Sequence, residues 1–123
     1  MGGAGSTEEL SARIAALDRR CRDGEAVPAE ERVLDLTPVY RGRGWASGEG
    51  RAPLPQGLDR HLDLVECARD PRWSAHFAPH FTHISLYRSR DRCYWLLRYD
   101  PAARAHRLEL VGTEADALTA YGP

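Results

Sequence analysis

Histidine, tyrosine and arginine side chains gather in one stretch of the chain, where they could transfer protons, stack on rings and bind anions. Residues 72–107 hold four of the five histidines, seven of the ten aromatic residues, and seven arginines against two acidic residues. All 17 basic residues are arginine, whose planar fork of donors suits carboxylates and phosphates. The whole protein has a net charge of −1, so any anion-binding surface must come from this local cationic stretch.

An alternation of apolar and polar residues predicts three strands in this region, over 81–88, 93–99 and 105–111. Successive side chains of a strand point to opposite faces, so the aliphatic side is expected to meet the helices. The second strand is apolar on both sides, and we place Trp95 and Leu97 inward because together they suit a core. The predicted outer face then carries His83, Ser85, Tyr87, Tyr94, Arg98, Arg107 and Glu109.

This outer face is compatible with two kinds of binding and with one kind of catalysis. Arginine and tyrosine on a sheet surface bind the phosphates and stack on the bases of RNA, and both residue types are common in protein interfaces. His83 and Glu109 could act as general base and acid in RNA cleavage. An ordinary solvated face with cross-strand ion pairs has the same composition, so we do not expect an enzyme. The candidate binding residues on this face are Tyr87, Tyr94, Arg98 and Arg107.

Three histidines, His76, His80 and His83, have the +4 and +3 spacing that would align zinc ligands on one helix face. Pro79 lies inside that turn and makes a regular helix unfavourable. On a strand, His80 and His83 would face opposite ways. No CxxC or HExxH motif accompanies them. They are kept as candidate metal ligands, but no metal or other cofactor is expected.

Residues 41–57 predict a glycine- and proline-rich loop that is long for a domain of this size. Trp45 is the only aromatic residue of this loop. A tryptophan in a loop either anchors the loop on the core or contacts a partner. Trp45 therefore joins the candidate binding residues.

The N-terminal part of the chain predicts a helix over 6–23, after a flexible start at 1–5. Apolar residues recur there at the spacing of one helix face, at Leu10, Ile14, Leu17 and Cys21. This narrow apolar stripe could pack on its own domain or on a partner helix; packing on its own domain is the commoner case, and we expect the helix at the margin of the core. The strands are then expected to fold without residues 1–24.

The remaining segments predict short elements around the strands. Residues 29–32 are typical of a helical turn, and residues 32–36 are typical of a short strand. Residues 57–69 predict a second helix that ends before Pro71, because the residue before a proline avoids the helical conformation. A short C-terminal helix is expected over 113–120, with Thr113 as its cap and Asp116 at the third helical position.

These elements predict a single α+β domain over 1–123. Its parts are an N-terminal helix, a second helix, a three-stranded antiparallel β-meander, a fourth short strand near 32–36 and a short C-terminal helix. The three cysteines are far apart and the N-terminus has no apolar signal segment, so we expect free thiols and a cytoplasmic protein. No segment approaches the length of a membrane span, so no membrane partner is expected.

The function that these observations favour is that of a small intracellular protein-binding or adaptor module. An RNA-binding or RNA-cleaving domain that uses the cationic face is the alternative, and a zinc-dependent enzyme is the third hypothesis. The sequence has no phosphate-binding loop, nucleophile elbow or dinucleotide motif that would point to another enzyme class.

Overall fold

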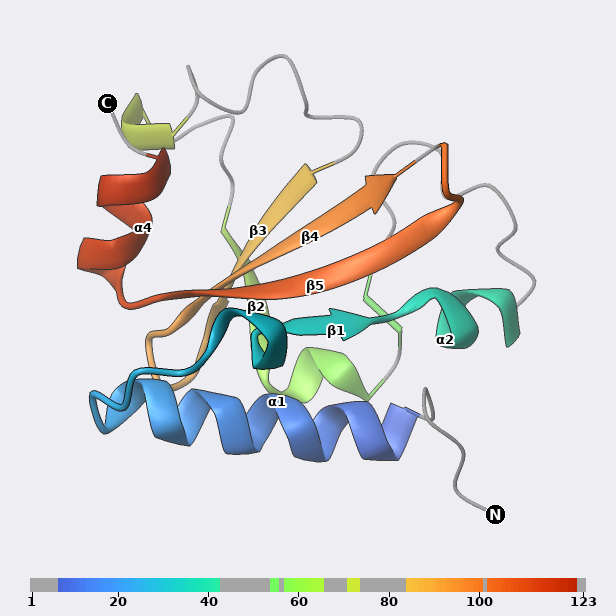
Figure 1. The fold of residues 1–123 in the computed structure, drawn as a ribbon, viewed down its shortest axis with the longest axis horizontal. Coiled ribbons are helices and arrows are strands. Elements are labelled where there is room, and N and C mark those ends of the chain that lie inside the picture. Colours follow the sequence, from blue (N-terminus) through green and yellow to red (C-terminus); the bar gives the residue numbers. More distant parts are fainter. Residues whose placement is uncertain are drawn as a thin grey trace.

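A five-stranded antiparallel sheet is the centre of the protein, and one long helix lies across it (Figure 1). The computed structural model describes residues 7–42, 54–55, 57–65, 71–73, 84–100 and 102–121. The strand order in the sheet is β1-β5-β4-β3-β2. Its strands are β1 (Val33–Asp35), β2 (Leu62–Val65), β3 (Ile84–Ser89), β4 (Tyr94–Asp100) and β5 (Ala105–Gly112).

The predicted meander is confirmed, because β3, β4 and β5 follow one another in sequence and pair antiparallel. The short strand predicted near 32–36 is confirmed as β1, which pairs with β5. The predicted strands nevertheless understate the sheet, because β2 forms its other edge by pairing with β3. The α+β class is confirmed.

The second helix predicted over 57–69 is wrong. Residues Leu58–Arg60 form only the short 3-10 helix η2, and the chain then enters β2. Leu58 and Leu62 are buried, as they would also be on the inner side of a helix. Their spacing of four residues also fits one face of a strand. The pairing of β2 with β3 gives the main-chain groups of Leu62–Val65 their hydrogen-bond partners in the sheet. Residues 66–69 lie outside the described part of the chain.

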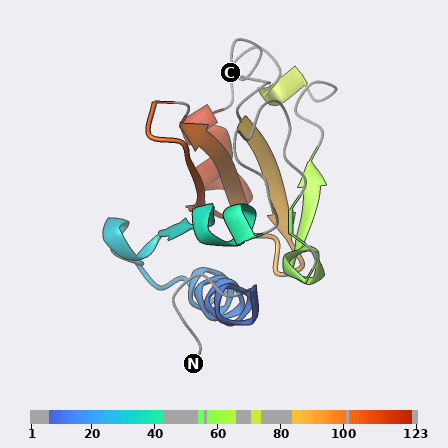
Figure 2. The same ribbon diagram turned by 90° about the vertical axis from the view of Figure 1, so that its right-hand side faces the viewer.

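Helix α1 (Thr7–Arg22) covers one face of the sheet, called here the inner face (Figure 2). The predicted helix and its buried stripe are confirmed. The expected position at the margin of the core is wrong, because the helix supplies a whole layer of the main core. The residues of α1 and of the inner face that form this core include Leu10, Ile14, Leu17, Cys21, Leu34, Leu62, Tyr87, Trp95, Leu97, Leu108 and Leu110.

The opposite, outer face of the sheet is covered at one end by a second, smaller apolar cluster. Helix α4 (Glu114–Tyr121) lies at that end (Figure 1) and contributes Ala117. The C-terminal helix and its cap are confirmed, since the main-chain N–H of Thr113 donates to the Asp116 carboxylate at 2.8 Å. The buried members of this second cluster are Trp73, Leu86, Tyr94, Leu96 and Ala117.

Two short elements frame β1. The helical turn predicted before this strand is confirmed as the 3-10 helix η1 (Ala29–Glu31), whereas the short helix α2 (Thr37–Gly42) was not predicted. Helix α2 takes the first two residues of the loop predicted over 41–57. Most of that loop, and the predicted flexible start at 1–5, lie outside the described residues. Within the described ranges, no helix has the length and apolar character needed to cross a membrane.

Candidate functional site

Four of the predicted site residues lie outside the described part of the chain, namely Trp45, His76, His80 and His83. The zinc site, the loop contact and the pairing of His83 with Glu109 therefore stay predictions. Among the residues that the structure describes, no three histidine, cysteine or acidic side chains are grouped so that they could hold a metal ion.

Tyr87 lies on the inner face of the sheet, so its predicted outward position is wrong. Its side chain is 6% exposed and lies opposite Trp95 in the pairing of β3 with β4. Ser85 shares this face and lies opposite Leu97. The prediction failed because Leu86, which was expected to face the helices, is buried in the outer cluster. Where both faces of a strand are covered, both carry apolar residues, so the apolar pattern does not show which face meets the helix.

Tyr94 lies on the outer face, as predicted, but its side chain is not accessible. It is 4% exposed and packs against Trp73, with the two ring centroids 5.6 Å apart. The guanidinium of Arg72 adds a cation–π contact at 4.4 Å from the Trp73 ring. A buried tyrosine does not stack on a nucleic-acid base, so neither predicted tyrosine is placed for that role.

Arg98 and Arg107 are exposed on the open half of the outer face, where they lie directly opposite one another on β4 and β5. Like charges at opposed positions of a sheet repel. Among the paired positions of the described strands, this is the one at which two like charges meet. Nη2 of Arg98 lies 3.1 Å from Oε1 of Glu109, which offsets part of the repulsion. Arg107 has no such ion pair within the described ranges.

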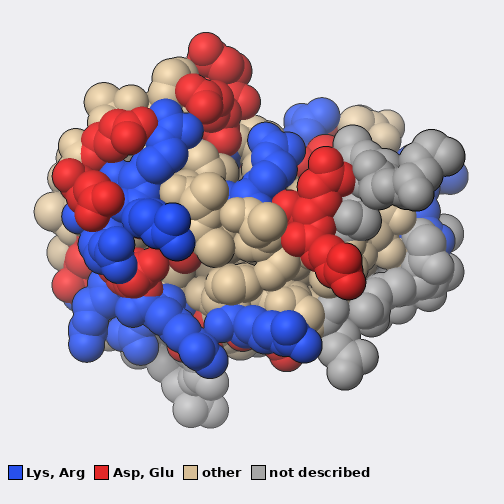
Figure 3. All heavy atoms as spheres, turned by 90° about the horizontal axis from the view of Figure 1, so that it is seen from below, with Lys and Arg blue, Asp and Glu red and all other residues tan. Residues whose placement is uncertain are grey.

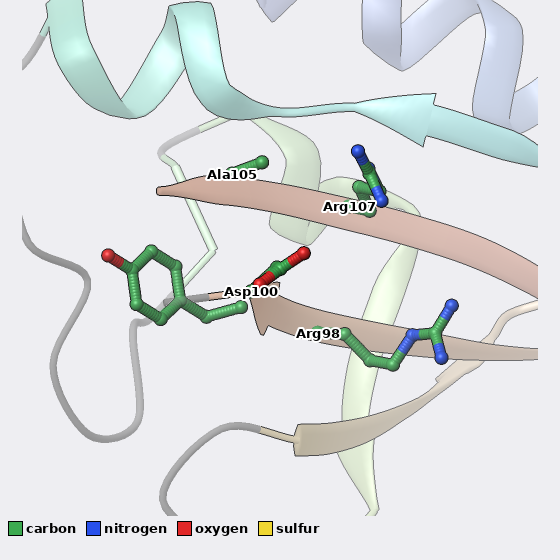
Figure 4. A pocket seen from close by; sticks show the side chains of 5 residues that line it. Arg98, Asp100, Ala105 and Arg107 are labelled. Carbon is green, nitrogen blue, oxygen red and sulfur yellow. The ribbon is translucent and has the colours of Figure 1, made fainter. Parts of the chain in front are cut away.

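A pocket of about 310 Å³ lies beside the two arginines, and its lining includes Tyr99 and Asp100. Figure 4 shows Arg98 and Arg107 projecting from neighbouring strands, with Asp100 at the end of β4. The Asp100 carboxylate accepts hydrogen bonds of 3.0 and 3.3 Å from two main-chain N–H groups of the following turn. The Asp100 carboxylate is therefore engaged by the turn, and the positive charge on the pocket lining comes from Arg98, which also pairs with Glu109, and from Arg107.

The open half of the outer face has mixed charge. Asp35 on β1 is exposed and lies opposite Arg107 in the register, on the side away from Arg98. The two cations thus lie among carboxylates, and not within a broad cationic field. We call this surface the arginine face, and define it by Asp35, Arg98, Asp100, Arg107 and Glu109.

A second pocket, of about 540 Å³, lies between α1 and η2 and holds a serine–histidine pair that no sequence pattern indicated. Oγ of Ser11 and Nε2 of His61 are 2.6 Å apart, which is close enough for a histidine to activate a serine. A serine nucleophile also needs a histidine that is oriented by a further group. Within the described residues His61 has no carboxylate partner for this purpose, so we interpret the bond as a structural link between α1 and η2.

A buried acidic residue joins α1 to the sheet. Asp18 is 3% exposed, and its carboxylate accepts a hydrogen bond of 2.7 Å from Nε1 of Trp95. Burial raises the pKa of Asp18 to about 6, although hydrogen bonds from Trp95 and Ser89 oppose the rise. Asp18 follows Ile14 by four residues, on the flank of the predicted stripe. A helical pattern alone does not show which flank the sheet covers, so the sequence did not reveal this burial.

Comparison with protein families, with curated proteins and with solved structures finds no match for this chain. Any functional inference therefore rests on the geometry of its own residues. The Ser11–His61 and Asp18–Trp95 pairs have their hydrogen-bond partners inside the fold. The arginine face instead presents opposed cations at the surface, beside a pocket, and is the better candidate for binding.

Proposed function

We propose that this domain is a protein-binding module, and that Arg98 and Arg107 together receive a carboxylate of the partner. The opposition of these two exposed cations across β4 and β5 is the observation that carries the proposal. A carboxylate between them would replace repulsion by attraction, and the guanidinium group suits a carboxylate because it offers two parallel donors. The pocket that both arginines line leaves room for such a side chain.

The composition of the arginine face favours a protein partner over RNA. Asp35 and Glu109 lie next to the arginines in the register, and their charges would repel a chain of phosphates more strongly than a single carboxylate, which can lie between the two arginines. The tyrosines that were expected to stack on bases are buried. RNA binding on the same face remains the alternative proposal, and it makes a different experimental prediction.

The test is selection of binders from a random peptide library displayed on phage, with the purified domain as target. The wild-type domain is expected to enrich peptides that contain aspartate or glutamate. The Arg98→Gln, Arg107→Gln double variant should bind the enriched peptides roughly tenfold or more weakly, since hydrogen bonds to charged groups are lost. The matched control is Arg13→Gln, Arg19→Gln, which removes two exposed arginines of α1 and should bind like the wild type.

Enrichment without acidic residues, or equal binding by the double variant, would contradict the proposal. A random single-stranded RNA oligomer provides the second arm, with titrations at low and at physiological salt. Affinity that falls steeply with salt, with a slope that Arg107→Gln flattens by about one unit, would favour RNA instead.

A further inference from the structure

Two cysteines meet where the end of α1 packs on the start of β4. Cys21 lies in the last turn of α1, and Cys93 immediately precedes β4. Both side chains are buried and neither is in a disulfide. Both side chains belong to the same buried core cluster. Sγ of Cys93 also lies 3.7 Å from the main-chain oxygen of Asp18, one helical turn before Cys21.

Contacts on both sides of the two thiols hold the helix and the β3–β4 turn in place. Nη1 of Arg22 lies 3.3 Å from Oδ1 of Asp91, which ties the end of α1 to this turn. The main-chain N–H of Cys93 donates to Oγ of Ser89 at 3.0 Å. A disulfide needs two cysteines whose side chains face each other across a short distance, and the contact of Cys93 Sγ with the main chain of Asp18 places this thiol at the helical turn that carries Cys21.

We propose that Cys21 and Cys93 are an oxidisable dithiol, which a small disulfide such as oxidised glutathione converts into an intramolecular disulfide between α1 and β4. Cys21, the more exposed of the two, first loses its proton to water. Its thiolate attacks one sulfur of oxidised glutathione, forms a mixed disulfide and releases one glutathione thiolate. Cys93 then loses its proton, attacks Sγ of Cys21 and expels the second glutathione. The two cysteines lose two electrons, and one oxidised glutathione is reduced to two thiols.

The surroundings of the pair set the conditions for this reaction. Burial raises the pKa of the Cys21 thiol and of the Cys93 thiol. Because the thiolate is the reacting form, oxidation should be slow near neutral pH and faster as the pH rises. The disulfide would close a loop of about 70 residues and restrict the unfolded chain. It should therefore raise the urea concentration at which the protein unfolds.

The test uses the full chain with Cys67→Ser, which leaves Cys21 and Cys93 as the remaining thiols. The folded protein is incubated with oxidised glutathione at about pH 8.5, near the ordinary cysteine pKa. Its free thiols are then counted, and its peptides are mapped without reduction. We expect both thiols to disappear, one peptide pair to be linked through Cys21 and Cys93, and a reducing agent to restore both thiols. Cys93→Ser in the same background should yield only a glutathione adduct on Cys21, and Cys21→Ser should leave the more deeply buried Cys93 thiol unreacted over the same time.

The same protein unfolded in urea is the control for the oxidant, since both of its thiols must react. If folded protein keeps both thiols under conditions that oxidise the unfolded chain, the proposal is wrong. A folded protein that ends with two glutathione adducts and no internal link would also overturn it. These outcomes are independent of the arginine face, so they leave the proposed binding function unaffected.

Discussion

The carboxylate of Asp18 loses most of its hydration when α1 packs on the sheet, and the fold therefore favours its protonated form. Its pKa is about 6 in the folded protein, against an ordinary value of 3.8. The stabilising effect of protonation is fully present below the ordinary pKa and is lost as the pH rises through about 6. The part of the unfolding free energy due to Asp18 should fall by about 2 kcal/mol between about pH 4 and pH 7.

Urea unfolding of the wild type and of Asp18→Asn over this pH range checks the prediction. Asparagine stays neutral and can still accept the hydrogen bond of Trp95. The variant should therefore match the wild type near pH 4 and exceed its stability near pH 7. The other ionisable groups near Asp18, which are Cys21, Asp91 and Cys93, are present in both proteins. If the difference in stability between wild type and Asp18→Asn does not change with pH, the pKa of Asp18 is not raised by the fold.

Arg107 should reduce the stability of the isolated domain, because it opposes Arg98 and, within the described ranges, forms no ion pair with Asp35, which lies opposite it on β1. Arg107→Gln is expected to raise the unfolding free energy by about 0.2–1 kcal/mol at low salt. Added salt screens exposed charges, so the gain should shrink as ionic strength increases. Urea unfolding at two salt concentrations measures both effects, with Arg13→Gln as the control. A loss of stability in Arg107→Gln would mean that Asp35 compensates its charge.

The face of the sheet on which a side chain lies could be predicted from the sequence where only one of the two faces suits the residue. Trp95 was expected to be buried and is 0% exposed, because a strand with Trp95 and Leu97 on one side matches a core. Tyr87 was assigned to the wrong face, since β3 is covered on both sides and its pattern is ambiguous. The opposition of Arg98 and Arg107 depends on strand register, which the spacing of residues along the chain does not specify.

At the scale of whole elements, α1 is a layer of the core, so its removal should unfold the protein. A chain that begins at Glu25 would expose Leu97 and Leu108 to water and leave Nε1 of Trp95 without its acceptor. We expect this chain to lose cooperative unfolding, as measured by circular dichroism during heating. The full chain treated identically is the reference. A sigmoidal transition in the truncated chain would show that the strands form a sufficient core alone.

Gly112 connects β5 to α4 and should tolerate no side chain. Its φ is +138°, and a Cβ atom would lie 2.8 Å from Cγ of Asp116, whose carboxylate caps α4. Gly24 is a matched control, because its φ is +80° but a Cβ atom there would have no neighbour within 4 Å. Gly24→Ala should cost about 1–2 kcal/mol for the left-handed backbone alone. Gly112→Ala should lower the unfolding free energy by more than Gly24→Ala does, as measured by urea unfolding. Equal losses would show that α4 can move away from the added Cβ atom.

Elements were predictable from the sequence where local signals agree. The spacing of Leu10 to Cys21 and the capping pair Thr113 and Asp116 are local, and both helices were found. Strand β2 was not found, because Leu62–Val65 carries a pattern that fits a helix as well as a strand. Its pairing with β3 is a long-range contact, and such contacts decide between two local structures of similar free energy.

For the molecule as a whole, the sequence supported the α+β class and the central meander, but not the number of strands or the arrangement of layers. Helix α1 lies across the inner face, whereas α4 covers one end of the outer face (Figure 1, Figure 2). Figure 3, which views the molecule from the side of α1, shows arginine and acidic side chains side by side. This mixture agrees with the low net charge of −1. A charge of that size gives no long-range attraction to polyanions, so recognition depends on local geometry such as that of the arginine face.

The central position of β4 has a consequence for the time scale on which parts of the protein open. Residues Tyr94–Leu97 are buried on both faces, and β4 is paired along both edges, with β3 and β5. Their amide hydrogens should exchange with solvent deuterium only when the whole molecule unfolds. The edge strands β1 and β2 have three and four residues and, among the described strands, are paired on one side only, so their amides should exchange through brief local openings. The slowest exchange rates, at Tyr94–Leu97, would then report the total stability of the protein directly, without denaturant.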